Sequence, residues 1–185
     1  MRRAPEKIGG KGNPVRRPAI ARFLLAALFS SFLPALAQTA KPLPGGFRDL
    51  KWRAHPTPGM KLVKEQTVGD DAAYRRPSDV KKMNGAALES ITYSFYKGQL
   101  HSVAIQTDAG QGAKLLASLK TNWGEPSQAA ANVFVWKDES ETLAFFRGTA
   151  LDGPDSRGEL FIVCKPLAEE AHRAEIERRE KAGLR

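Results

Sequence analysis

The sequence is poor in the residues that build metal centres and disulfides: it has one cysteine and three histidines among 185 residues. A lone cysteine, Cys164, excludes an intramolecular disulfide and the usual sulfur-rich zinc sites. No two histidines have a metal-ligand spacing such as His-x-x-x-His, so we predict neither a metal nor a cofactor. Cys164 lies within the apolar segment ELFIVCKPL, which favours a buried strand residue over a nucleophile.

Common catalytic and nucleotide-binding motifs are also missing from the sequence. Gly110-Gln111-Gly112 precedes a predicted helix, but the lysine and hydroxyl residue that complete a phosphate-binding loop do not follow. No serine stands in a Gly-x-Ser-x-Gly motif. Because no set of residues typical of an active site is left, we predict that the protein is not an enzyme.

The main apolar run is too short to cross a bilayer, which takes about 20 residues. It extends from Phe23 to Leu36, contains 14 residues, and follows a basic stretch that ends at Arg22. Ala35-Leu36-Ala37 provides a small-x-small cleavage site. Residues 1–37 are therefore predicted to be a cleavable secretion signal, which implies a periplasmic or secreted protein without a stable transmembrane anchor; an uncleaved anchor is the alternative.

Most of the excess positive charge lies in this signal. The whole chain has 29 basic and 20 acidic residues and a net charge of +9. Removing the seven basic residues and one glutamate of residues 1–37 leaves 22 basic and 19 acidic residues, a net charge of +3. A charge of this size gives no reason to expect a nucleic-acid partner.

The remaining segments predict one α+β domain with a mainly antiparallel sheet packed against one central amphipathic helix. We expect a linker over residues 38–46, the domain over 47–167 and a charged, largely solvated helical tail over 168–185. Leu115, Leu116, Leu119 and Trp123 form one apolar stripe of the central helix, which Asp108 is expected to cap and Gly124 to end. Strands are predicted in NVFVWKD, ETLAFFRG and ELFIVCKPL, the first two joined as a hairpin.

ITYSFYKGQLHSVAIQ, residues 91–106, predicts a further β-hairpin with a histidine in its second strand. A two-residue turn at Lys97-Gly98 would pair Phe95 with Leu100 and place the apolar residues that follow out of phase. A three-residue turn would pair Tyr93 with His101 and align the apolar faces, and we predict this register. His101 opposite Tyr93 is expected to have a structural role.

The densest basic region after the signal is the candidate binding site. It comprises Tyr74, Arg75, Arg76, Lys81 and Lys82. A tyrosine beside two guanidinium groups and two lysines suits an anionic partner, such as phospholipid head groups, an acidic wall polymer or an acidic protein surface. A solvated loop is the simpler interpretation of the same residues.

Four segments resemble a family of small exported bacterial proteins of uncharacterised activity. They are FRDLKW, YRRPSD, ALESITYSFYKGQLHSVAIQ and LLASLKTNWGEP. The likeness covers about residues 47–167 and is most specific at residues 74–76 and 93–98. That family usually has a glycine directly after the tryptophan of its first segment, whereas Arg53 follows Trp52 here. The resemblance implies a compact α+β domain and brings no catalytic residue.

Together these features favour an exported, non-catalytic binding or assembly module of the bacterial cell envelope, with an envelope protein or an anionic envelope component as its partner. The alternative is a small periplasmic hydrolase centred on His101 and Tyr93. That alternative needs a third group to orient the histidine, within a cleft.

We predict that the protein purified from the envelope of its host begins at Gln38. The signal is removed during export, so the intact mass should equal that of residues 38–185. Intact-mass spectrometry checks this expectation. A mass that retains the first 37 residues would contradict it.

Overall fold

A computed structural model describes residues 42–183, and over this range the chain forms a nine-stranded sheet with two α-helices and a small separate hairpin. The sheet order is β3-β4-β6-β7-β11-β10-β9-β8, with β5 paired to β6, and all pairs are antiparallel. The elements are β1 (Gly46–Phe47), β2 (Leu50–Lys51), β3 (Lys61–Leu62), the 3-10 turn η2 (Lys64–Gln66), β4 (Asp71–Arg75), β5 (Lys82–Met83), β6 (Ala86–Tyr96), β7 (Gln99–Thr107), α2 (Gly112–Trp123), β8 (Ser127–Ala130), β9 (Val133–Lys137), β10 (Thr142–Thr149), β11 (Arg157–Cys164) and α3 (Lys165–Lys181).

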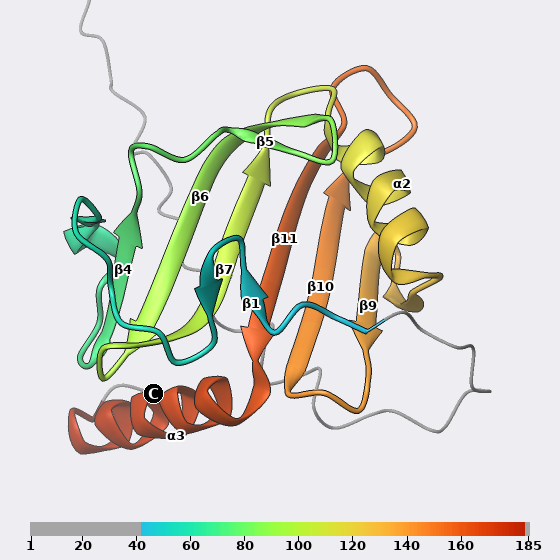
Figure 1. Ribbon diagram of the computed structural model, residues 1–185. Coiled ribbons are helices and arrows are strands. Elements are labelled where there is room, and N and C mark those ends of the chain that lie inside the picture. The colour runs from blue at the N-terminus through green and yellow to red at the C-terminus, as the bar shows by residue number, and fades with distance from the viewer. Residues whose placement is uncertain (1–41, 184–185) are drawn as a thin grey trace, which may run out of the picture. The chain divides into compact units, whose positions relative to one another are not determined.

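The predicted α+β class with a mainly antiparallel sheet is confirmed. A central helix is not confirmed, because α2 covers only part of one sheet face (Figure 1). Leu115, Leu119 and Trp123 pack into the core as their spacing predicted. The predicted cap is wrong: α2 begins at Gly112, beyond Asp108, and its N-cap residue Gln111 makes no side-chain capping bond.

Gly112 lets α2 begin very close to β11. A Cβ at this position would lie 2.4 Å from the backbone carbonyl carbon of Arg157, which is closer than any real side chain allows. Gly110, by contrast, has a φ of 74°, a left-handed conformation that suits the turn before the helix. The Gly-x-Gly pattern therefore serves a turn and a close helix–strand contact.

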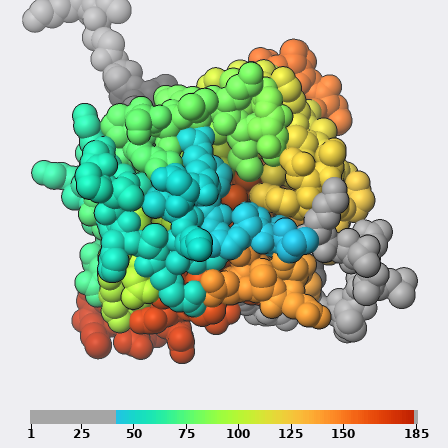
Figure 2. Space-filling view, viewed as in Figure 1, coloured from blue at the N-terminus to red at the C-terminus, as the bar shows by residue number. Residues whose placement is uncertain are grey.

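Helix α2 lies on one face of the sheet, which we call the α2 face. The rest of this face is covered by residues 43–54, which we call the N-terminal strap. It carries β1 and β2 and runs across the sheet from β10 toward β6 (Figures 1 and 2). Four of its side chains enter the core. They are Leu43, Phe47, Leu50 and Trp52.

Hydrogen bonds fix the strap at both ends. The Trp52 indole N–H donates to Thr142 Oγ1 over 2.8 Å, and that hydroxyl donates to the Pro44 carbonyl over 2.8 Å. The Leu43 amide donates to the Asp138 carboxylate at 2.7 Å. Beyond Trp52, the backbone N–H of Arg53 donates to the Leu100 carbonyl at 3.0 Å, at the turn of the β6–β7 hairpin. The strap is therefore attached to β10 and to β7 at once.

The predicted hairpin register is wrong. Val103 and Ile105 enter the core on the same side as Tyr93, as predicted, but His101 lies on the other side of the sheet, beside Tyr96. The turn has two residues, Lys97 and Gly98, with φ values of 48° and 76°, so Phe95 pairs with Leu100. A β-bulge at His101 then adds one residue to β7, and Tyr93 pairs with Val103. The bulge shifts the phase by one residue, which returns the apolar side chains of β7 to the α2 face.

The C-terminal helix packs against the sheet instead of standing free. α3 begins at Lys165, before the predicted start at residue 168, and buries Leu167 and Ala168. It contacts β6, β7 and β11. Cys164, the last residue of β11, is fully buried as predicted, and burial raises the pKa of its thiol.

Strands β9, β10 and β11 lie in the three predicted segments, and β9 and β10 form the predicted hairpin. Strands β4, β5 and β8 were not predicted. The proposed signal, residues 1–37, and residues 38–41 of the linker lie outside the described residues. Within residues 42–183, no helix is both long and apolar enough to span a membrane.

We predict that deletion of His101 abolishes cooperative unfolding or lowers the free energy of unfolding by at least 3 kcal/mol. Without the bulge, Val103 and Ile105 would turn toward the opposite face and leave the core. His101→Ala keeps the bulge and should cost about 1–2 kcal/mol. Urea unfolding followed by circular dichroism measures both variants, and equal losses would contradict this role of the bulge.

Candidate functional site

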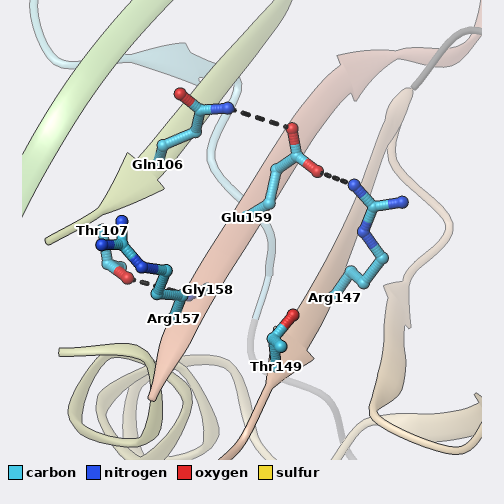
Figure 3. Close-up of a pocket in the computed structure, with 7 residues that line it drawn as sticks. All are labelled: Gln106, Thr107, Arg147, Thr149, Arg157, Gly158 and Glu159. Carbon is cyan, nitrogen blue, oxygen red and sulfur yellow. Dashed lines mark hydrogen bonds and ion pairs between the residues drawn. The ribbon is translucent and has the colours of Figure 1, made fainter. Parts of the chain in front are cut away.

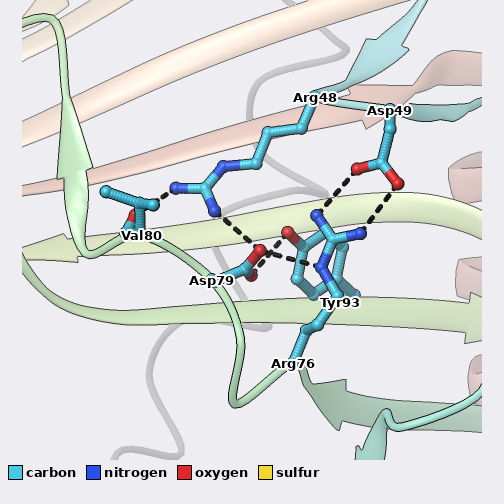
Figure 4. Close-up of polar contacts among 6 residues, drawn as sticks. All are labelled: Arg48, Asp49, Arg76, Asp79, Val80 and Tyr93. Carbon is cyan, nitrogen blue, oxygen red and sulfur yellow. Dashed lines mark hydrogen bonds and ion pairs between the residues drawn. The ribbon is translucent and has the colours of Figure 1, made fainter.

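The densest set of polar contacts lies where the strap meets the sheet edge, around Asp79. We call it the Asp79 cluster; it consists of Arg48, Asp49, Arg76, Asp79 and Tyr93 (Figure 4). Three separate segments supply these residues: the turn between β1 and β2, the loop after β4, and strand β6. The cluster therefore joins parts of the chain that are distant in sequence.

The Asp79 carboxylate is the centre of the cluster. Its side chain is only 6% exposed. Oδ1 forms an ion pair with Arg48 at 2.6 Å and accepts a hydrogen bond from Arg76 at 2.8 Å, and Oδ2 accepts a hydrogen bond from the Tyr93 hydroxyl at 2.7 Å. A buried carboxylate needs such donors, because its desolvation otherwise costs several kcal/mol.

Arg76 is held on two sides. Its two Nη atoms donate to the two carboxylate oxygens of Asp49 at 2.8 and 2.9 Å, a bidentate pair, while Nε donates to Asp79. The hydrogen bond to Asp49 raises the pKa of Arg76, and the same bond lowers the pKa of Asp49. The guanidinium carbon also lies 5.6 Å from the centre of the Tyr93 ring. Arg76 is thus fully engaged inside the protein.

Arg48 adopts a backbone conformation that glycine usually occupies. Its φ is 56°, at the first position of the two-residue turn between β1 and β2. Its guanidinium also donates to the carbonyl oxygen of Val80. A strained residue whose side chain joins a buried network indicates that the network stabilises this turn.

The Asp79 cluster can hold segments together, but its charges balance. Two arginines and two carboxylates pair with one another, and the Tyr93 ring is fully buried. Burial, and then the hydrogen bond to Asp79, raise the pKa of Tyr93 above its ordinary value, so the phenol stays neutral. The cluster has neither a spare charge for an anion nor a phenolate for chemistry.

The predicted binding residues are divided between the protein interior and its surface. Tyr74 is half-buried on β4, edge-on to Phe95 with ring centres 5.4 Å apart. Arg76 belongs to the Asp79 cluster. Arg75, Lys81 and Lys82 are exposed, and within residues 42–183 they have no ion-pair partner.

The two residues of the hydrolase alternative lie apart. The Tyr93 hydroxyl binds Asp79, whereas His101 Nε2 lies 3.0 Å from Asp71 Oδ1 on β4, and its ring is edge-on to Tyr96. Tyr93 and Tyr96 are three positions apart on one strand, so they face opposite sides of the sheet. His101 Nδ1 is buried without a hydrogen-bond partner, which leaves the ring with one orienting group and no nucleophile beside it.

A shallow hollow lies at the ends of β7, β10 and β11 (Figure 3). Its volume is about 120 Å³, below the roughly 300 Å³ of typical ligand pockets. It is lined by Gln106, Thr107, Arg147, Thr149, Arg157, Gly158 and Glu159. Glu159 accepts from Arg147 and, at 3.5 Å, from Gln106, while Arg157 pairs with Glu89 at 3.3 Å. The hollow is polar and its charges are paired.

Metal ligation finds no support in the described part of the chain. Within residues 42–183, no three His, Cys, Asp or Glu side chains are grouped so that they could hold a metal ion.

Comparison of the chain with protein-family models, with curated proteins and with solved structures found no match.

Arg48, Asp49 and Asp79 were not among the residues predicted from the sequence. A signal was present, because FRDLKW, YRRPSD and YSF, segments that carry the resemblance, contain all five residues of the Asp79 cluster. Charged residues of opposite sign occur in the first two segments, but nothing in their spacing shows that they meet.

We predict that Tyr93 makes the protein sensitive to alkali. Its pKa is raised from 10.0, so its contribution to stability is complete below pH 10 and is lost as the pH rises from about 10 toward the raised pKa. The free energy of unfolding should fall by up to about 1.4 kcal/mol per pH unit in that range. Tyr93→Phe should remove this slope, and at pH 7 it should cost about 1–2 kcal/mol.

Urea unfolding at pH 9, 10 and 11 tests the prediction, with Tyr74→Phe as the matched control that retains Tyr93. Parallel pH dependences for the wild type and Tyr93→Phe would show that the phenol is not the responsible group.

Proposed function

We propose that the protein is an exported, non-catalytic binding module of the bacterial cell envelope. The observation that supports this function is the distribution of unpaired charge. The groups that could perform chemistry are engaged internally: Arg76 and Tyr93 in the Asp79 cluster, and His101 with Asp71. Within residues 42–183, Arg75, Lys81 and Lys82 have no ion-pair partner, and they are exposed beside the fixed Asp79 cluster.

Arg75, Lys81 and Lys82 are the candidate contacts for an anionic component of the envelope. They lie at the end of β4, in the loop that follows and on β5. The loop begins directly after Arg75 and includes Arg76 and Asp79, so the Asp79 cluster limits its movement. Fixed cations lose little entropy when they bind, which favours a specific electrostatic contact over a diffuse one.

A sedimentation assay tests this function. The purified mature protein, residues 38–185, is mixed with a total envelope preparation from its host at 50 mM and 300 mM salt, and the bound fraction is measured. We expect binding that weakens at the higher salt concentration. The variant Arg75→Gln/Lys81→Gln/Lys82→Gln should bind at least tenfold more weakly at 50 mM salt.

A control variant loses the same charge elsewhere. Lys51→Gln/Arg173→Gln/Lys181→Gln changes three other exposed cations that have no ion pair within residues 42–183. It should bind within about twofold of the wild type if the site is specific. Equal losses in the two variants, or no binding by the wild type, would reject the proposed function.

A further inference from the structure

The loop between β4 and β5 is held by the Asp79 cluster at its centre. Asp79 accepts side-chain hydrogen bonds from Arg76 and Tyr93 and forms an ion pair with Arg48, which also donates to the carbonyl oxygen of the next residue, Val80 (Figure 4). The Lys82 amide also donates to the Val80 carbonyl at 2.8 Å, and the Leu88 amide donates to the Lys81 carbonyl at 3.1 Å. The backbone on both sides of Val80 is therefore fixed.

This fixed backbone holds an apolar side chain in solvent. Val80 is 70% exposed, although Asp79 beside it is only 6% exposed at its side chain. The arrangement reverses the usual preference, in which the valine is buried and the aspartate is exposed. The polar contacts of Asp79 and of the adjacent backbone hold Val80 outside the core.

Cations surround the exposed valine. Lys81 and Lys82 follow it directly, and both are exposed without an ion pair in the described part of the chain. Lys114 of α2 lies beside the turn between β5 and β6: its Nζ is 3.8 Å from the position that a Cβ on Gly85 would take. Asp108 is exposed near Ala87 but pairs with none of these lysines. The positive charges of these three lysines are therefore not paired within residues 42–183.

An exposed valine beside three unpaired lysines suits a flat anionic surface. A protein partner would require a larger apolar area, yet the other large apolar residues exposed within residues 42–183, Leu62 and Ile176, lie on β3 and α3. A lipid head-group layer needs no matching cavity: lysines meet its phosphates, while one protruding valine reaches the acyl boundary.

We propose that Val80, Lys81 and Lys82, with Lys114, form a tip that docks on an anionic phospholipid surface. This inference rests on the proposed binding function and names its partner class. Three lysines beside the surface, together with an inserted valine, predict reversible binding that depends on salt.

Vesicle co-sedimentation tests the inference with the purified mature protein, residues 38–185. Vesicles of phosphatidylcholine with 30% phosphatidylglycerol should bind the protein at 25 mM salt, and vesicles of phosphatidylcholine alone should not. Each lysine near an anionic surface strengthens partitioning about fivefold, so Lys81→Gln/Lys82→Gln should weaken it about 25-fold. Val80→Ser should weaken it about threefold without changing its salt dependence.

The matched control is Lys61→Gln/Lys64→Gln, which removes two exposed cations from β3 and η2. It should bind within about twofold of the wild type, and melting curves confirm that each variant is folded. Equal binding to both vesicle types, or equal losses in the two double variants, would overturn the inference. Salt-sensitive binding to the envelope preparation without binding to vesicles would also overturn it, in favour of an acidic polymer or protein, while leaving the proposed function intact.

Discussion

The structure depends on one buried carboxylate. Asp79 is nearly inaccessible to solvent and is surrounded by two guanidinium groups and a phenol. Removing any donor would leave charge with incomplete compensation in a place that water barely reaches. Because the donors come from the strap, from the loop itself and from β6, the requirement to satisfy one side chain fixes three segments relative to one another.

The need to satisfy Asp79 also decides which side chains on this edge of the domain are used internally and which remain exposed. Arg76 and Tyr93 look reactive in the sequence, but their hydrogen-bonding capacity is used in holding Asp79 and Asp49. Neighbouring residues in the chain point outward and keep their charge. Arg75 is exposed beside Arg76, and Val80 is exposed beside Asp79, so each interior anchor has a neighbour in solvent.

The long, strongly alternating strands and the stripe of α2 could be predicted, because burial of one face leaves a period in the sequence. The register of the β6–β7 hairpin could not be predicted in this way. A three-residue turn, and a two-residue turn followed by a bulge at His101, return Val103 and Ile105 to the same face, so the apolar pattern does not distinguish them. Strand β4 was missed because Asp71 and Arg75 make it look polar, and β8 because its four residues are all exposed. The Asp79 cluster forms through long-range pairing of charges, which has no period.

The strap shows why polar anchors matter when the apolar contacts are already favourable. Phe47, Leu50 and Trp52 would gain most of their burial energy in several positions along the sheet, since hydrophobic contact has little directionality. Arg48 and Arg53 stand on either side of Leu50 and Trp52 with positive φ values of 56° and 67°, and the two guanidinium groups pair with Asp79 and Glu141 respectively. Glycine would adopt these conformations more easily but would carry no charge. The chain thus accepts local strain at two positions, and the ion pairs, with the Trp52–Thr142 hydrogen bond, select one position of the strap.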